Sequence, residues 1–126
     1  MDCIFCDIIE GKRTCEKICE YNNCIAIYDE YPVSPGHALI IPKRHVTNIN
    51  ELNKDEYEDL WNCINWVTSL TQDCEECDGF NIGINIGKAA GQTIDHLHIH
   101  VIPRYTGDVE NPQGGIRGVI PNKQHY

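Results

Sequence analysis

Polar and apolar residues alternate strictly from His96 to Val101, within the stretch 96–103 that reads His-Leu-His-Ile-His-Val-Ile-Pro. Such alternation predicts a β-strand with one buried face, because successive strand side chains point to opposite sides of a sheet. The residues expected in the core are Leu97, Ile99 and Val101. The other face carries His96, His98 and His100. Three adjacent imidazoles each need hydrogen-bond partners, so this face predicts a site with chemistry.

Three further stretches have the pattern of buried strands, and one has the pattern of an amphipathic helix. The predicted strands cover residues 23–28, 37–42 and 80–86. The predicted helix runs from 53 to about 71, where the apolar residues at helical spacing are Tyr57, Leu60, Trp61, Ile64 and Val67. Asn53 and Glu56 resemble a capping pair at its start. Residues 7–10 resemble one helical turn that ends at Gly11.

A length of 126 residues predicts one domain, 1–126, with residues 105–126 as a C-terminal arm or tail. No apolar run approaches the roughly 20 residues of a membrane span, and the start of the chain lacks the pattern of a secretory signal. A cytoplasmic protein is therefore expected. The net charge of −9 argues against a surface that binds a nucleic-acid duplex or a membrane. A small phosphorylated ligand needs only a local pocket and is not excluded.

Eight cysteines occur at irregular spacings, which favours reduced thiols over a disulfide scaffold. Cys3 and Cys6 form a Cys-x-x-Cys pair, the spacing that lets two thiolates reach one tetrahedral zinc. Two buried thiols are an equally good interpretation of the pair alone. Further ligands could come from His45 or from the histidine face. A four-cysteine site with the second pair, Cys74 and Cys77, is a weaker alternative.

The loop before the histidines, residues 87–93, is built of small residues that let backbone N–H groups approach an anion. Asn85, Gln92 and Thr93 add side-chain donors there. A Gly-rich hairpin loop has the same composition, but the position directly before three histidines favours an anion site. Asp29 follows the first predicted strand. It either caps a turn or accepts hydrogen bonds from a sugar diol.

Two chemistries fit the histidine face on residue type alone. Alternate strand positions can chelate one metal ion, for which neutral imidazole is the commonest ligand. Alternatively, one imidazole attacks a substrate while its neighbours orient it and stabilise charge. The pattern leaves both open.

Taken together, these motifs resemble the histidine triad (HIT) family of nucleotide hydrolases and transferases. The resemblance rests on the run His-φ-His-φ-His-φ-φ from His96, where φ is apolar, on Asn85 and 91–93, and on the segment 35–45 with His37 and His45. It covers residues 3–104, and 114–121 is similar to microbial members near the dinucleoside-polyphosphate branch. The resemblance implies an α+β, HIT-like fold with an antiparallel sheet of about five strands, one long helix and one short helix. It also implies a homodimer.

The resemblance also implies a role for each site residue. The middle histidine, His98, would attack the α-phosphorus of a nucleotide and form a nucleotidyl-histidine (phosphohistidine) intermediate, which water then hydrolyses. His100 would contact the phosphate and the leaving group, and His96 completes the triad but is turned toward the scaffold. The residues expected to bind the nucleotide are Asp29 for the ribose, Asn85, Gly91, Gln92 and Thr93 for the α-phosphate, Phe5, Ile8 and Ile27 for the base, and His37 beside them.

In zinc-containing members the first histidine joins the N-terminal cysteine pair, which implies a structural Zn²⁺ on Cys3, Cys6, His45 and His96. The expected function is hydrolysis at the α-phosphate of a purine nucleotide conjugate, either a dinucleoside polyphosphate or a nucleoside phosphoramidate with an AMP or GMP moiety. The alternatives are a nucleotidyl transferase or phosphorylase that uses the same histidine, and a nucleotide-binding interaction module with incidental catalysis. A zinc hydrolase with all three histidines as ligands would leave the cysteine pair without a role.

Overall fold

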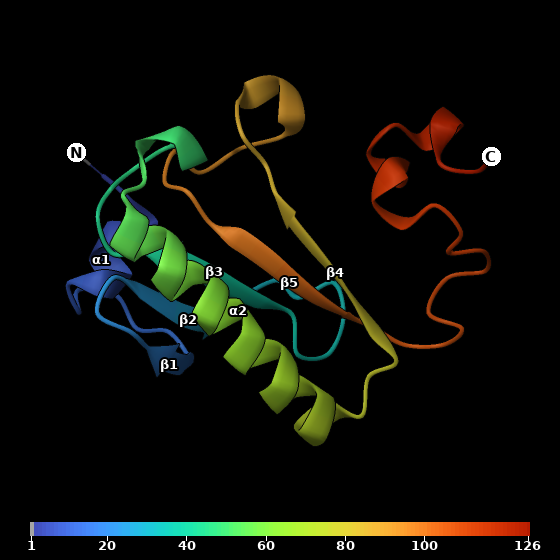
Figure 1. Ribbon diagram of the computed structural model, residues 1–126, viewed down its shortest axis with the longest axis horizontal. Coiled ribbons are helices and arrows are strands. Elements are labelled where there is room, and N and C mark those ends of the chain that lie inside the picture. The colour runs from blue at the N-terminus through green and yellow to red at the C-terminus, as the bar shows by residue number, and fades with distance from the viewer. Residues whose placement is uncertain (1) are drawn as a thin grey trace.

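The computed structural model describes residues 2–126, so Met1 of the predicted domain lies outside the described residues. Within them, five strands form one antiparallel sheet in the order β1-β2-β3-β5-β4 (Figure 1). The strands are β1 (Lys17–Glu20), β2 (Cys24–Tyr28), β3 (Ala38–Pro42), β4 (Gly79–Ile84) and β5 (Ile99–Arg104). The helices are α1 (Ile4–Ile9) and α2 (Lys54–Glu75). The predicted fold class, with one long and one short helix, is confirmed.

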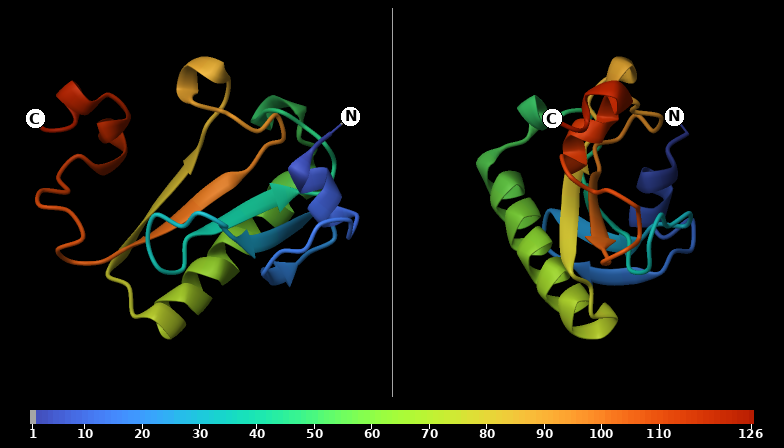
Figure 2. Two further views of the ribbon diagram at one scale, coloured as in Figure 1. Left: turned by 180° about the vertical axis from the view of Figure 1, so that it is seen from behind. Right: turned by 90° about the vertical axis from the view of Figure 1, so that its right-hand side faces the viewer.

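The two helices cover opposite faces of the sheet, as the edge-on view in Figure 2 shows. The long helix α2 packs its apolar stripe, which includes Leu60 and Val67, against Ile40 and Val101. On the other face, α1 places Phe5 in a second apolar cluster with residues of β2 and β3. The central strands are therefore buried on both sides, which explains why their sequences are almost continuously apolar.

Helix α2 begins as its sequence predicts. The Asn53 side chain accepts a hydrogen bond from the Glu56 backbone N–H at 2.9 Å, and the Glu56 side chain accepts one from the Asn53 N–H at 2.9 Å. This reciprocal capping box satisfies two N–H groups that the helix itself leaves free. The helix continues one turn beyond the predicted end near Thr71, because Thr71 is buried and neither Gly nor Pro interrupts the chain before Glu75.

Other elements also differ from the sequence prediction, and β4 ends at Ile84, two residues before its predicted end. Helix α1 starts at Ile4, earlier than predicted, because the Cys3 side chain caps its first turn. The four-residue edge strand β1 was not predicted, since it is short and pairs with β2 through an irregular register. Strand β5 begins at Ile99, not at His96, and before it the Leu97 N–H bonds to the Val46 carbonyl at 2.7 Å, outside the sheet ladder. Leu97, Ile99 and Val101 are buried as predicted, but His96 and His98 are buried too.

The C-terminal arm contains two 3₁₀ turns, η3 (Gly115–Val119) and η4 (Pro121–Lys123), at the end of the molecule away from the N-terminus (Figure 1). Further 3₁₀ turns lie at η1 (Ile49–Glu51) and η2 (Lys88–Ala90). The arm reaches the sheet where η3 contacts β4. Among the residues described, no helix is both long enough and apolar enough to cross a membrane.

Candidate functional site

The histidine face divides into two environments within five residues. His96 is completely buried and turns toward Cys3 and Cys6, whereas His98 and His100 line a cavity of about 1080 Å³. The ring centroids of His98 and His100 are 5.1 Å apart. The three imidazoles do not gather around one point, so the described residues do not support a three-histidine metal centre.

The buried end is a cluster of four possible metal ligands. The ligand atoms of Cys3, Cys6, His45 and His96 all lie within 4.8 Å of one another. The Cys6 Sγ is 3.2 Å from the His45 Nδ1 and 3.5 Å from the His96 Nδ1, and the Cys3 Sγ is 3.4 Å from the His96 Nδ1. Sulfur and nitrogen ligands of one tetrahedral zinc are separated by about 3.6 Å, given the usual bond lengths. The donor set and its spacing therefore fit a zinc ion.

Local structure positions these four ligands. Cys3 and Cys6 stand at the start of α1, where the Cys3 Sγ accepts a hydrogen bond from the Cys6 N–H at 3.4 Å. The His96 Nε2–H donates to the Pro42 carbonyl at 2.8 Å, which leaves the Nδ1 lone pair aimed at the thiols. Metal-bound histidines commonly donate their second N–H in this way. Burial and the neighbouring Cys3 raise the pKa of the Cys6 thiol to about 11 in the absence of a metal.

The position of His45 is stabilised by a contact of its neighbour Arg44 that the sequence did not predict. The half-exposed Arg44 guanidinium donates two hydrogen bonds to the Glu56 carboxylate, at 2.8 and 3.1 Å. Glu56 is buried and also closes the capping box of α2. The loop that carries His45 is therefore tied to the start of the long helix.

His98 presents one nitrogen to the cavity because its other nitrogen is occupied. The His98 Nδ1–H donates to the backbone carbonyl of His96 at 2.8 Å. The neutral ring then carries no proton on Nε2, which is the tautomer that a nucleophile needs. The Phe5 ring meets His98 edge-on at a centroid distance of 5.0 Å and holds the imidazole from the α1 side.

His100 has the opposite tautomer, and His37 sets it. The Val33 N–H donates to the His37 Nδ1 at 3.1 Å, so neutral His37 carries its proton on Nε2. That Nε2–H donates a hydrogen bond to the His100 Nδ1 at 3.0 Å, so neutral His100 carries its own proton on Nε2. Burial lowers the pKa of both His37 and His100, which favours these neutral forms.

The tautomer of His37 also excludes a metal on the second cluster of possible ligands, Asp29, His37 and His100. A metal bound to the His37 Nε2, with Val33 donating to Nδ1, would require a ring with no proton at all. A hydrogen-bonded chain is the better description. Asp29 completes it, with its Oδ2 3.5 Å from the His37 Nε2. The tight turn at Gly36, with a φ of 87°, delivers His37 into this position.

Asp29 fulfils the turn role that its position predicts. Its Oδ1 accepts a hydrogen bond from the Tyr31 N–H at 2.8 Å. The carboxylate also lines the cavity, so one side chain shapes the turn and faces the space where a ligand would bind. Its predicted contact with a ribose stays a prediction.

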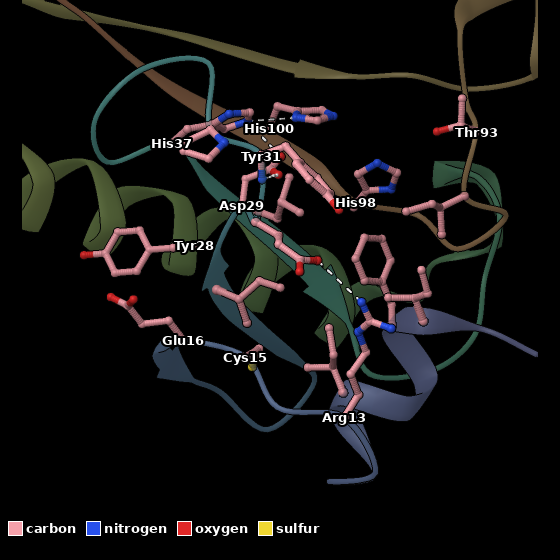
Figure 3. Close-up of a pocket in the computed structure, with 18 of the residues that line it drawn as sticks. Arg13, Cys15, Glu16, Tyr28, Asp29, Tyr31, His37, Thr93, His98 and His100 are labelled. Atoms are coloured by element: carbon pink, nitrogen blue, oxygen red, sulfur yellow. Dashed lines mark hydrogen bonds and ion pairs between the residues drawn. The ribbon is translucent and has the colours of Figure 1, made fainter.

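Most of the predicted ligand residues meet at this cavity (Figure 3). Those that line it are Phe5, Ile8, Ile27, Asp29, His37, Asn85, Gly91, Thr93, His98 and His100. Gln92 does not line it. Its side chain accepts a hydrogen bond from the Gly87 N–H at 2.8 Å and donates to the Thr47 carbonyl at 3.0 Å, so it braces the loop that carries Gly91 and Thr93.

Sequence reasoning did not find the charged residues at the far side of the cavity. Arg13 and Glu30 line it and form an ion pair at 3.5 Å. Arg13 lies in the irregular segment after α1, which offered no periodicity to interpret. Glu30 directly follows Asp29 in the sequence, and this adjacency to a candidate ligand residue was the only signal that could have identified it.

The fold and site define an α+β protein in which one histidine segment serves both a buried Cys₂His₂ cluster and an open cavity. A model of the HIT domain family matches residues 10–107. The chain therefore belongs to the HIT family, as its motifs predict.

Several curated relatives have names that state an activity. The chain is 39% identical over 107 residues to an adenylylsulfatase, HINT3, of Arabidopsis thaliana, which covers 85% of this chain and 54% of the plant protein. A bis(5'-adenosyl)-triphosphatase of Dictyostelium discoideum is 43% identical over 86 residues, with 68% and 58% covered. The adenosine 5'-monophosphoramidase hnt1 of Schizosaccharomyces pombe is 36% identical, with 82% and 75% covered. The chain thus spans little more than half the length of the first two.

Solved structures show the same fold. A HIT family protein from Bacillus anthracis superposes with a TM-score of 0.81 at 36% identity and covers 85% of this chain and 76% of its own. A histidine triad family protein from Mycobacterium smegmatis, described as zinc-bound, gives a TM-score of 0.80 at 36% identity, with 86% and 78% covered.

Proposed function

We propose that this protein is a nucleotide hydrolase that acts at the α-phosphate of a purine nucleotide conjugate through a covalent intermediate on His98. The opposite tautomers of His98 and His100 carry the proposal. One ring offers an unprotonated Nε2 and its neighbour offers an Nε2–H, both into one cavity. A nucleophile beside a proton donor is what transfer of a nucleotidyl group from a basic leaving group requires.

The reaction proceeds in two balanced steps. In the first, the His98 Nε2 bonds to the α-phosphorus while the bond from phosphorus to the leaving group breaks; the His100 Nε2–H donates a hydrogen bond to the leaving atom, which takes up its proton from solvent. In the second, water attacks the phosphorus, the bond to His98 breaks, and the proton that the water loses passes to solvent. His37 and Asp29 hold the His100 ring in the required tautomer throughout.

The remaining cavity residues bind the nucleotide. Asn85, Thr93 and the backbone at Gly91 lie where they can donate to the α-phosphate oxygens, which carry the charge that develops during transfer. Asp29 accepts hydrogen bonds from the ribose hydroxyls. The apolar residues Phe5, Ile8 and Ile27 enclose the base. Gln92 acts on this site through the loop that it braces.

A structural zinc on Cys3, Cys6, His45 and His96 belongs to the same proposal. Four protein ligands leave a tetrahedral zinc no open position, so the ion would stabilise the fold and take no part in the chemistry. Through α1 it would fix Phe5 against the histidine segment. The zinc-bound relative supports this assignment.

The three named relatives support hydrolysis of phosphoanhydride or phosphoramidate bonds of adenosine nucleotides, the enzyme class that the sequence predicts. They do not separate hydrolysis from transfer of the nucleotidyl group to inorganic phosphate. Both reactions use His98 in the same first step. The homodimer and the cytoplasmic location stay predictions.

The test is to incubate the purified protein with adenosine 5'-phosphoramidate and with diadenosine tetraphosphate, with and without inorganic phosphate. AMP as the product supports hydrolysis, whereas ADP formed only with phosphate supports phosphorolysis. Turnover of at least one substrate is expected, and it should vanish in His98→Ala. A wild-type protein that binds AMP but turns over neither substrate would favour the binding-module alternative. The matched control is His125→Ala, because His125 lies in the exposed arm.

A further inference from the structure

The far side of the cavity carries a pair of opposite charges that the proposed reaction does not use. The guanidinium of Arg13 lies 3.5 Å from the carboxylate of Glu30, and both side chains line the cavity. Figure 3 shows Arg13 at the lower edge of the cavity, whereas His98 and His100 lie at its upper edge. Among the permanently charged lining residues of the described chain, Arg13 is the only cation.

The backbone at Arg13 and Glu30 is fixed by hydrogen bonds, whereas the charged ends of the two side chains make few contacts. The Arg13 N–H donates to the Asp7 carbonyl at 3.2 Å, and Glu30 lies in the turn that the Asp29 carboxylate stabilises. Within the described residues the guanidinium makes one side-chain hydrogen bond, to Glu30, so most of its five N–H donors remain open to a ligand. The side chains are 47% and 68% exposed, so their pairing contributes little and a ligand can replace it at low cost.

The position of this pair relative to the substrate follows from the proposed pose. With the α-phosphorus at His98 and the ribose at Asp29, the base extends away from the histidines, between the apolar residues near α1. Its outer edge then reaches the side of the cavity that Arg13 and Glu30 border. An apolar wall alone accepts any purine, so discrimination between bases must come from polar groups at this edge.

We propose that Arg13 and Glu30 read the polar edges of a guanine base and give the enzyme a preference for guanosine over adenosine conjugates, an inference that rests on the proposed function. Guanine offers two adjacent donors, N1–H and the N2 amino group, to a carboxylate. It offers two adjacent acceptors, O6 and N7, to a guanidinium. In the same pose, adenine turns its N1 lone pair toward Glu30 and its N6 amino group toward Arg13, so both contacts become unfavourable.

The test compares kcat/KM for guanosine 5'-phosphoramidate and adenosine 5'-phosphoramidate, substrates that differ only in the base. The wild type should favour guanosine by about 10-fold, since bidentate recognition of a base edge discriminates at least this well. Glu30→Gln and Arg13→Gln should each lower kcat/KM for guanosine by several-fold and bring the ratio close to one. Glu10→Gln and Lys12→Gln are the matched controls, because these neighbours form an exposed ion pair with each other and do not line the cavity.

The affinities of His98→Ala for GMP and AMP, measured by calorimetry, separate this inference from the proposed function. GMP should bind about 10-fold more tightly. If the wild type turns over neither phosphoramidate, the proposed function fails, and the ratio of the two affinities still reports on base selection. If the enzyme is active but its kcat/KM for the adenosine substrate equals or exceeds that for the guanosine substrate, the inference on base selection fails and the proposed function stands. A selectivity that survives in both cavity variants would also overturn it.

Discussion

His96 and His98 lie two residues apart on one face of one segment, yet they belong to different parts of the molecule. The His96 ring is completely buried, donates to Pro42 and faces two thiols. The His98 ring donates to the backbone carbonyl of His96, two residues earlier, and faces a cavity. Neither residue type nor strand face distinguishes them. In each ring one nitrogen donates to a backbone carbonyl, and this hydrogen bond decides which nitrogen keeps a free lone pair: Nδ1 in His96 and Nε2 in His98.

The comparison also shows how the two environments are connected. The Phe5 ring lies 5.8 Å from the His96 ring and 5.0 Å from the His98 ring, edge-on to both. Phe5 stands between Cys3 and Cys6 at the start of α1, so whatever fixes the cysteines also fixes one wall of the cavity. In the proposed function the buried cluster serves stability, and the open cavity serves the chemistry.

The different roles of His96 and His98 are tested most sharply by replacing each histidine with alanine, one at a time. His98→Ala should lower kcat by at least about 10³-fold, as loss of a nucleophile does, while the zinc content stays unchanged. His96→Ala should instead lose the zinc and much of the stability. Activity assays, metal analysis and urea denaturation of both variants check this. A His98→Ala protein that keeps most of its activity would refute the assignment.

Removal of His37 should act on catalysis through His100. His37→Ala should lower kcat for a phosphoramidate by about 100-fold, because the His100 Nε2–H would no longer be held as a hydrogen-bond donor to the leaving group. The loss should shrink for a substrate whose leaving group departs without a proton, such as a nitrophenyl ester of the nucleotide. An equal loss with both substrates would indicate a purely structural role for His37.

Loss of one thiol should test the buried cluster. Cys6→Ala should lower the free energy of unfolding by about 3 kcal/mol or more and abolish stoichiometric zinc, because metal binding is coupled to folding. Where the variant remains folded, its kcat should change only a few-fold. The exposed Cys74→Ala is the matched control. A Cys6→Ala protein with unchanged melting temperature and zinc content would show that the cluster holds no metal.

The tie between Arg44 and Glu56 should have a smaller effect on stability. Glu56→Ala removes the partner of Arg44 and half of the capping box, and should cost about 2 kcal/mol of unfolding free energy. Glu58→Ala, at an exposed position of the same helix, is the control. Chemical denaturation of both variants measures the difference. Equal stability of the two would show that the buried carboxylate contributes nothing beyond its surface neighbour.

Acid should weaken the zinc-loaded protein through its buried histidines. Burial lowers the pKa of His37 and His100, so the unfolded chain binds protons near its ordinary value of 6.5 while the folded protein does not. Stability is therefore full above pH 6.5 and falls as the pH drops below it, by up to about 1.4 kcal/mol per pH unit for each group. Urea denaturation at pH 7.5 and 5.5 measures this slope. His37→Asn should make it shallower, and an unchanged slope would contradict the attribution.

Much of this molecule could be predicted from its sequence, and the failures have physical causes. The long helix and four of the five strands follow from periodicity and capping. The four ligand residues of the buried cluster follow from the resemblance to the HIT family. The strand β1 was missed because a short edge strand leaves little alternation. The tie between Arg44 and Glu56, the loop-bracing role of Gln92 and the pair formed by Arg13 and Glu30 depend on tertiary contacts between separate segments. Residue type alone cannot reveal such contacts.

The division between the two histidines is tested most directly by trapping the intermediate. The wild-type protein would be mixed with excess nucleoside phosphoramidate, quenched within the first turnover in alkaline denaturant, digested and mapped by tandem mass spectrometry. The account predicts one nucleoside monophosphate on His98, and none on any residue of His98→Ala. Modification of His96 or His100, or full turnover with no modified histidine at any time, would contradict it.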